Sequence, residues 1–493
     1  MAWIIPGELD WHLGVFLLAL DGILVFLSWL HILLNKRKTA SVLLWLIVVA
    51  GLPVLGTLAY VVLGYDRHGR RATAKELAGR VERERLQGID QRLAPLSAAW
   101  SGPCETQRFP DSLDPFGRLL SRAGRFHAVD GCTLELLDGG DAIYEAQLQA
   151  IAEAERAVLL EVYILETDAV GRRVLDALGE AAKRGVQCRL LYDAIGSSGA
   201  SGSVLDEARR QGVDVRAFDQ RARLRGRFQI NLRNHRKILV VDGRIGFTGS
   251  ANVSKVHLEG TPEDERSEDL HFRLRGPVVA QLSAVFAEDW YSTTGEALEE
   301  ALFFPESEAD GGALCRTLPS GPDGDYGAFH EVLVAAIHGA QRSVRIVTPY
   351  FIPSDEVSLA LRVAAKRGVK VEVLVPGQLD HAFIRWAMNA FLEPLLRAGV
   401  RIRRRPGAFL HAKVLLVDDL WALVGSSNVD PRSYFLNYEL NLGVVGEAEL
   451  TALGRWVEDQ WGSGAPIDRE EFARRSVGRR AWENFWALFA PLL

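Results

Sequence analysis

The sequence contains little that would build a metal, disulfide or nucleotide site. Its four cysteines are spaced neither like zinc ligands nor like a disulfide framework; they are Cys104, Cys132, Cys188 and Cys315. No P-loop and no Gly-x-Gly-x-x-Gly fingerprint occurs in the chain, which argues against a bound nucleotide. We therefore expect a protein of a reducing compartment that needs neither a metal ion nor a cofactor.

The chain also lacks a strong excess of charge of one sign. Its formal net charge is −6 over 493 residues, and its pI is about 6.1. Proteins that bind polyanionic nucleic acid are usually basic, so we expect no nucleic-acid partner. The length is sufficient for two or three domains, each with its own core.

Long apolar runs are confined to the N-terminal segment. Residues 14–34 carry only Asp21 as a charge, and residues 42–63 carry none. Each run is long enough to cross about 30 Å of hydrocarbon. We therefore expect residues 1–64 to hold two transmembrane helices, at about 14–34 and 42–63, paired as a hairpin. Pro53 is expected to kink the second helix, and a re-entrant hairpin is the alternative.

The basic residues beside these runs predict an orientation. The loop between the runs carries three Lys or Arg, and the segment after the second run carries seven more by residue 85. The positive-inside rule then places the rest of the chain in the cytoplasm, on a multi-pass protein of the inner (plasma) membrane. A cleaved signal peptide is disfavoured, because residues 1–13 contain acidic residues and no Lys or Arg. Residues 65–126 are expected to be a linker with helical stretches.

An eighteen-residue motif occurs twice. It reads HRKILVVDGRIGFTGSAN at 235–252 and HAKVLLVDDLWALVGSSN at 411–428. The shared positions are His235, Lys237, Asp242, Ser250 and Asn252 in the first copy, and His411, Lys413, Asp418, Ser426 and Asn428 in the second. The apolar run after each Lys predicts a buried strand, so the His and the Lys project from one face. The returning strand brings the Ser and the Asn to the same end.

These residue types suit phosphoryl transfer. That chemistry requires a nucleophile or base, a proton donor and hydrogen-bond donors for the non-bridging oxygens. A single His-x-Lys in a strand is more often accidental, but two copies at identical spacing are not.

The motif belongs to a longer internal duplication. The hexapeptide AAKRGV occurs at 181–186 and again at 364–369, an offset close to that between the two histidines. We assign the first half to residues 127–300 and the second to residues 301–493. The order of elements predicts an α/β fold in which each half has a mixed, largely parallel sheet covered by helices. We expect the halves to pack about a pseudo-two-fold axis with both histidines in one cleft. Two independent domains with separate sites are the alternative.

The pattern H-x-K-x4-D-x6-G-S-x-N, twice in one chain, resembles the phospholipase D superfamily. The resemblance implies two sandwich-like halves around one shared active site, and phosphodiester exchange through a phosphohistidine without a metal ion. It also implies catalytic roles for the His, Lys and Asp of each motif, with the Ser and Asn either binding phosphate or supporting the catalytic side chains. An acid follows each motif in that superfamily, which makes Asp269 and Glu439 candidates to orient the imidazoles. Glu268 is the rival in the first half.

Further stretches, among them TPYFIPSDE, DPRSYFLNYELN and the apolar N-terminal hairpin, resemble the bacterial cardiolipin synthases. This resemblance implies transfer of a phosphatidyl group from one phosphatidylglycerol to another at a bilayer, giving cardiolipin and glycerol. The loop VSKVHLEGTPEDERSEDLH after Asn252 departs from the family pattern, in which an Asp, a Tyr and a Trp are expected. Another donor or acceptor, such as phosphatidylethanolamine, therefore stays open. The sequence also leaves open a hydrolase, either lipase or nuclease, and a membrane scaffold with relic motifs.

The expected mechanism uses the two histidines in turn. His235 attacks the donor phosphorus while His411 protonates the departing glycerol, and His411 then deprotonates the acceptor hydroxyl. The near symmetry of the motifs allows the two roles to be exchanged. Two basic clusters, at 221–236 and 401–405, are expected to bind anionic headgroups. The tail 474–493 is expected to form an amphipathic helix that lies either in the membrane interface or on the protein body.

Overall fold

The computed structural model describes residues 8–35, 39–61, 126–218, 232–298, 311–322, 327–379 and 382–489. The chain divides into two compact units, residues 1–74 and residues 75–493, and each unit is described by itself. The linker expected at 65–126 lies outside the described residues except for Phe126.

The first unit consists of α1 (Glu8–Asn35), α2 (Thr39–Gly51) and α3 (Pro53–Ala59). The interruption expected at Pro53 is present: the chain leaves the helical conformation at Leu52 (φ −132°), as a residue before proline tends to do, and the second apolar run forms two helices. The helix α3 then turns back along α2, and the ring of Tyr60 lies 5.3 Å from that of Trp45. The Tyr60 hydroxyl also contacts His31 Nδ1 of α1 at 2.7 Å. Within the described residues, no helix combines the length and apolar character that a membrane crossing requires.

The second unit contains the duplication. Its first half runs through β1 (Val129–Asp138), α7 (Gly140–Ala152), β2 (Ala157–Val162), α8 (Ala169–Lys183), β3 (Gln187–Asp193), α9 (Gly202–Arg210), β4 (Asp214–Phe218), β5 (Arg233–Asn234), β6 (Ile238–Val241), β7 (Ile245–Gly249), the short 3₁₀ helix η3 (Lys255–His257), β8 (Ser267–Glu268), β9 (Leu270–Arg275) and α10 (Val278–Thr294).

The second half follows the same plan. It runs through β10 (Ala313–Ser320), α12 (Ala328–Gly339), β11 (Ser343–Val347), α13 (Asp355–Lys366), β12 (Lys370–Pro376), α14 (Ala382–Ala398), β13 (Arg401–Arg405), β14 (Phe409–Leu410), β15 (Val414–Val417), β16 (Trp421–Gly425), α15 (Pro431–Phe435), β17 (Asn437–Val445), α16 (Glu447–Ser463), β18 (Ala465–Pro466), α17 (Arg469–Ala473) and α18 (Val477–Ala487).

The strand order shows the duplication directly. The first half has the order β1-β9-β7-β6-β2-β3-β4, and the second has β10-β17-β16-β15-β11-β12-β13, with β18 at its edge. The two sheets are continuous, because β1 pairs with β10 in antiparallel orientation. The mixed α/β fold with two duplicated halves is therefore confirmed.

The expectation that each sheet is largely parallel is wrong. In the first half only the pairs β2–β3 and β3–β4 are parallel, whereas β1–β9, β9–β7, β7–β6 and β6–β2 are antiparallel. The physical reason is the motif hairpin β6–β7, whose tight turn can connect only antiparallel neighbours. Asp242 (φ 53°) and Gly243 (φ 66°) take the left-handed conformation of that turn. Asp418 and Asp419 do the same in the second copy.

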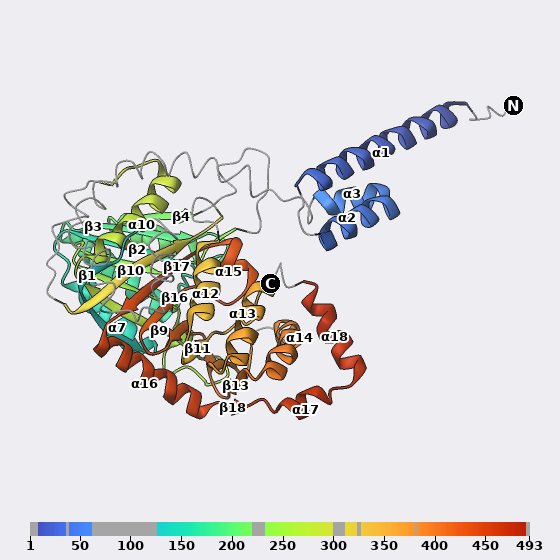
Figure 1. Cartoon of the computed structure of the whole chain (residues 1–493). Helices are drawn as coiled ribbons and strands as arrows, with labels where there is room; N and C mark the ends of the chain where they lie inside the picture. The colour runs from blue at the N-terminus through green and yellow to red at the C-terminus, as the bar shows by residue number, and fades with distance from the viewer. Residues whose placement is uncertain are drawn as a thin grey trace. The chain divides into compact units, whose positions relative to one another are not determined.

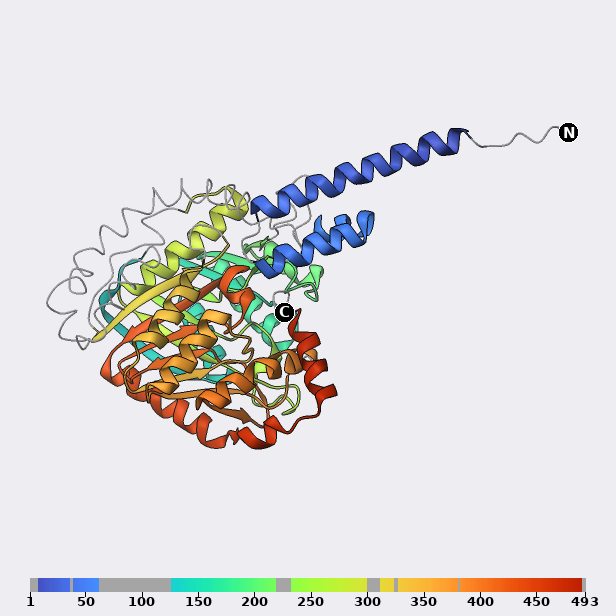
Figure 2. The same ribbon diagram turned by 45° about the vertical axis from the view of Figure 1, so that its right-hand side comes forward.

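The layers place the motif strands between two helical covers. The helices α7, α8 and α9 pack on the outer face of the first-half strands. The helices α12, α13 and α14 pack on that of the second half, as Figures 1 and 2 show. Between the halves lies a common core with α10 and α16, into which Ile238 and Val240 of β6 and Val414 and Leu416 of β15 project. Because alternate residues of each motif strand enter this core, the motif histidines are held at the junction of the halves.

Candidate active site

Two short strand pairs across the halves set the positions of the motif histidines. The strand β5 runs directly before His235 and lies parallel to β17 of the second half. The strand β14 runs directly before His411 and lies parallel to β8 of the first half. The amide of His235 donates to the carbonyl of Tyr438, and that of His411 to the carbonyl of Glu268, both at 2.8 Å. Each histidine is thus fixed to the strand of the other half that leads to the candidate acid.

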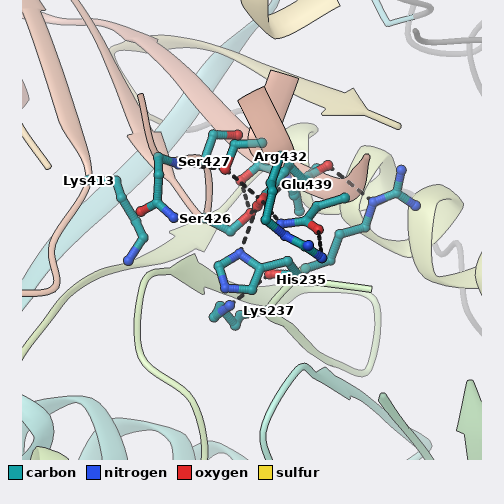
Figure 3. Close-up of polar contacts among 12 residues, drawn as sticks. His235, Lys237, Lys413, Ser426, Ser427, Arg432 and Glu439 are labelled. Carbon is teal, nitrogen blue, oxygen red and sulfur yellow. Dashed lines mark hydrogen bonds and ion pairs between the residues drawn. The ribbon is translucent and has the colours of Figure 1, made fainter. Parts of the chain in front are cut away.

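The carboxylates are exchanged between the halves. Nδ1 of His235 lies 2.9 Å from Oε2 of Glu439, as Figure 3 shows. Nδ1 of His411 lies 2.6 Å from Oδ1 of Asp269. Both candidate acids therefore contact a motif histidine, but each contacts the histidine of the opposite half. Glu268 instead forms an ion pair with Arg405 at 2.7 Å, so it is not the orienting acid.

Both carboxylates are held as anions. Burial favours the protonated form of Glu439, but His235 and Lys237 outweigh burial and lower its pKa. Burial acts in the same way on Asp269, where the facing imidazoles of His257 and His411 hold the pKa well below its usual range. An anionic carboxylate on Nδ1 selects the tautomer whose proton is on Nδ1, which leaves Nε2 with its lone pair for chemistry.

Hydroxyl and amide groups saturate the carboxylate oxygens. Glu439 accepts from the hydroxyl of Ser426 at 2.5 Å, from that of Ser433 at 3.0 Å and from the side-chain amide of Asn437 at 3.1 Å. Asp269 accepts from the hydroxyl of Ser267 at 2.8 Å. With these bonds the carboxylates cannot rotate freely, so the imidazole planes are fixed as well.

The motif lysines lie beside their histidines, as the i, i+2 spacing predicts. Nζ of Lys237 donates to the carbonyl of His235 at 2.7 Å, and Nζ of Lys413 donates to that of His411 at 2.5 Å. Burial lowers the pKa of Lys237 to about 8 and that of Lys413 to about 7. Each ammonium has two further N–H groups, which are suited to the equatorial oxygens of a phosphodiester.

Both imidazoles face one cavity of about 920 Å³, which His235, His411, Asn252 and Asn428 all line. The alternative of two separate sites is therefore wrong. The side-chain oxygen of Asn252 accepts from the amide of Ile164 at 3.2 Å. The side-chain oxygen of Asn428 is buried and has no hydrogen-bond partner among the described residues.

The motif aspartates lie elsewhere. Asp242 accepts from the backbone amides of Glu155, Arg156 and Ala157 at 2.8–3.0 Å. Asp418 accepts from those of Gln341, Arg342 and Ser343 at 2.7–2.8 Å. Each stands at the far end of its motif strand, roughly 20 Å from the histidine at 3.3 Å per residue. The predicted catalytic role of these two residues is wrong, because their carboxylates hold the chain segments that enter β2 and β11.

The motif serines hydrogen-bond to the backbone of a neighbouring strand. The hydroxyl of Ser250 accepts from the amide of Leu270 at 3.0 Å and donates to its carbonyl at 3.3 Å, which ties β7 to β9. It therefore supports the sheet and does not line the cavity. Ser426 makes the equivalent backbone bond to Leu440 at 2.9 Å and in addition holds Glu439. Of the two roles expected for the serines, Ser426 takes the supporting one, because it holds the carboxylate that orients His235.

A third imidazole lies in the site that the motifs did not indicate. His257 stands at the end of η3, in the loop that departs from the family pattern, and it lines the cavity. Its Nδ1 lies 2.6 Å from Oδ2 of Asp269, and its ring centroid lies 6.4 Å from that of His411. Asp269 thus holds two imidazoles, one on each oxygen. The only signal in the sequence was a histidine within the divergent loop.

The rest of the cavity wall combines charged side chains with aromatic rings. Arg233 and Arg432 line it, as do the rings of Tyr350, Phe383 and Phe409. Of the first basic cluster, residues 221–227 lie outside the described residues, and Arg236 is buried in an ion pair with Asp289 at 2.5 Å. Such a cavity suits an anionic phosphodiester that carries apolar chains.

Both motif histidines are neutral at neutral pH. Burial lowers the pKa of His235 to about 4, with Lys237 acting in the same direction and Glu439 opposing. Burial and Lys413 lower the pKa of His411 to about 3. A neutral imidazole is a competent nucleophile, whereas the other imidazole must gain a proton to act as an acid. A bound phosphodiester would supply the negative charge that raises both pKa values.

Comparison with known proteins assigns the family. The family model "Cardiolipin synthase, PLD-like domain" matches residues 148–290 and 333–461. Cardiolipin synthase A of Pseudomonas fluorescens is 35% identical, over 98% of this chain and 99% of the relative. Cardiolipin synthase 1 of Bacillus anthracis is 34% identical, over 94% of this chain and 91% of the relative.

A solved structure supports the fold. Phosphatidylserine synthase of Haemophilus influenzae superposes with a TM-score of 0.60 at 15% identity, covering 77% of this chain and 100% of the other. At this identity the likeness concerns the fold alone. Taken with the full-length relatives and the family match, it leads to one conclusion: the chain belongs to the cardiolipin synthase family of the phospholipase D superfamily.

Proposed function

We propose that the protein transfers a phosphatidyl group from one phosphatidylglycerol to the terminal hydroxyl of a second, forming cardiolipin and releasing glycerol. The observation that carries the proposal is the pair of imidazoles on one cavity, each oriented by a carboxylate from the opposite half. Neither motif histidine finds its orienting carboxylate in its own half.

In the first step, Nε2 of His235 attacks the donor phosphorus and a P–N bond forms. The bond from phosphorus to the glycerol oxygen breaks, and that oxygen takes its proton from His411. Lys237 and Lys413 stabilise the charge on the equatorial oxygens, together with Asn252 and Asn428. The phosphatidyl group is then held on His235, and glycerol is free to leave.

In the second step, the reaction runs in reverse with a different alcohol. His411, now neutral, removes the proton from the acceptor hydroxyl, whose oxygen attacks phosphorus as the P–N bond breaks. Both imidazoles return to their starting protonation states. One phosphodiester replaces another, so the reaction requires no energy source beyond the substrates.

A lipid product assay tests the reaction. Purified full-length protein given phosphatidylglycerol should yield cardiolipin and glycerol in equal amounts, measured by mass spectrometry. His235→Ala and His411→Ala should each lose more than about 99% of turnover, because a nucleophile or its acid is removed. Phosphatidic acid as the main product would favour a hydrolase. Cardiolipin formed only when phosphatidylethanolamine is added would assign a different donor. Either variant retaining a tenth of the activity would contradict a shared site.

The crossed pairing can be tested on the first step alone. A phosphatidyl donor with p-nitrophenol as leaving group needs no acid, so the His411→Ala variant should still form phosphohistidine 235 and then stall. Adding Glu439→Gln should slow this trapping on the order of a hundredfold, because the imidazole loses its orienting anion. Adding Asp269→Asn should leave the rate unchanged.

The position of the label decides the assignment of roles. If the His235→Ala variant carries the label on His411, and Asp269→Asn slows that labelling, the roles of the two histidines are exchanged. Slowing of the His235 step by Asp269→Asn alone would disprove the crossed pairing. Rapid-quench labelling followed by peptide mapping measures both the rate of labelling and the residue that carries the label.

The pH dependence follows from the shifted pKa values. The lysines are charged below their pKa values of about 7 for Lys413 and about 8 for Lys237, and His235 is neutral above about 4. For a soluble short-chain phosphatidylglycerol, kcat/KM should fall below about pH 4, where His235 becomes protonated, and its decline on the alkaline side should steepen above about pH 7, where loss of the charge on Lys413 adds to the loss of the proton from His411. Lys413→Arg keeps its charge at high pH, so it should move the alkaline limb toward the pKa of Lys237. An unmoved limb would show that Lys413 does not set it.

We also propose that the first unit anchors the protein in the inner membrane, with the catalytic unit in the cytoplasm. Many large apolar side chains on α1, α2 and α3 are exposed, among them Phe26 (64%), Ile47 (68%) and Leu55 (67%), and such a surface requires an apolar medium. When the chain is expressed in bacteria, it should stay in the membrane pellet after a carbonate wash, and protease added outside spheroplasts should leave the catalytic unit intact. Release by carbonate would refute the membrane anchor, and cleavage of the catalytic unit from outside would refute its cytoplasmic location.

A further inference from the structure

The C-terminal helix α18 packs on the protein in an unusual way. Along α18 the one buried residue is Glu483, while Trp482 is 47% exposed and Phe485 is 45% exposed. An amphipathic helix on a water-facing body normally buries its apolar side. In the described part of residues 75–493, the exposed large apolar side chains are Val477, Trp482, Phe485, Leu488, Phe489 and, outside this segment, Leu359.

Charged groups attach α18 to the body. The carboxylate of Glu483 accepts from the side-chain amide of Asn389 in α14 at 2.8 Å. It also accepts from Arg475 at 2.5 Å and from Arg479 at 3.2 Å. Arg475 in turn reaches Glu393 of α14 at 2.9 Å. The polar side of α18 therefore faces the protein, and its aromatic side is only partly covered by the protein.

The aromatic side of α18 connects to the active cavity. The ring of Trp486 lies 5.4 Å from that of Phe383, and Phe383 lines the cavity that holds the motif histidines. Trp386, one turn along α14, lies 5.6 Å from Trp482. A continuous aromatic surface thus runs from the cavity wall to the exposed face of α18.

A basic groove lies on the other side of the same helix. A cavity of about 500 Å³ between α13, α14 and α18 is lined by Arg362, Lys366, Arg397, Arg475 and Arg480, against the acids Glu393 and Glu483. The side chains of Arg397 and Arg480 are 62% and 48% exposed. The groove therefore presents positive charge beside an apolar ridge, which is the pattern of a helix that lies in the interface of an anionic bilayer.

We propose that α18, with the adjoining part of α14, is the surface by which the catalytic unit docks on a bilayer of anionic phospholipid. The aromatic ridge enters the acyl region, the basic groove binds headgroup phosphates, and the acyl chains of a substrate pass along Trp486 and Phe383 into the cavity. The inference rests on the proposed function for the identity of the substrate, but the docking itself does not require turnover. A second copy of this chain is the competing occupant, and the adjacent positive groove disfavours it, since a copy would bring the same charge.

Kinetics on two forms of one substrate test the proposal. The double variant Phe485→Ser, Leu488→Ser should raise KM for phosphatidylglycerol in vesicles about tenfold, equivalent to about 1.4 kcal/mol, with kcat unchanged. Its activity on a monomeric short-chain phosphatidylglycerol should equal that of the parent. Leu359→Ser, equally apolar and 54% exposed on α13, is the matched control and should change neither. An unchanged KM on vesicles in the double variant would overturn the proposal.

Photolabelling separates docking from catalysis. The full chain in vesicles that contain phosphatidylglycerol with an acyl-chain diazirine should carry lipid adducts on residues 477–489. Equal labelling from phosphatidylcholine vesicles would overturn the role of the basic groove, and chain-to-chain adducts at these residues would assign the ridge to a second copy. If α18 is labelled but neither form of phosphatidylglycerol is converted, the docking surface stands and the proposed function fails.

Discussion

The exchange of carboxylates between the halves is the interaction on which the site depends. Glu439 orients His235 and Asp269 orients His411, so neither imidazole is set by its own half. The short pairs β5–β17 and β14–β8 enforce this arrangement through the backbone. A displacement of one half would disturb both histidines together, and the buried core shared by the halves opposes such a displacement.

The same burial gives the site its electrostatic character. Two lysines and two neutral imidazoles lie out of water, and burial lowers the pKa of each of the four groups. An anionic phosphodiester is stabilised more strongly in a buried cavity of this kind than in a solvent-exposed cavity, because the anion restores the charged forms of the four groups that burial disfavours. Substrate binding and the protonation of the acid are therefore coupled.

The motif residues could be predicted from the sequence, since their spacing determines a local hairpin. Strand alternation places His235 and Lys237 on one face, and the Asp242–Gly243 turn returns the chain as β7. The partner of each acid could not be predicted, because it depends on strand pairing between segments far apart in sequence, 204 residues for Glu439 and 142 for Asp269. The spacing could not reveal the structural role of Asp242, because shared spacing shows that a residue is required but not whether chemistry or turn geometry requires it. The break at Leu52 could be anticipated only as a consequence of Pro53, and its extent depends on how α3 packs on α2.

The two halves differ in the region where the proposed reaction requires the two histidines to act differently. Two halves related by symmetry would treat both histidines alike, yet one of them has to begin the reaction and the other has to serve the leaving and entering alcohols. On the Glu439 side the carboxylate is held by hydroxyls and an amide, while on the Asp269 side a third imidazole, His257, takes one oxygen. Because His257 lies in the divergent loop and lines the cavity beside His411, the sequence change and the structural asymmetry occur at the same place. An imidazole next to His411 adds a group that can exchange hydrogen bonds with an alcohol, so the asymmetry falls on the side where, in the proposed mechanism, alcohols leave and enter.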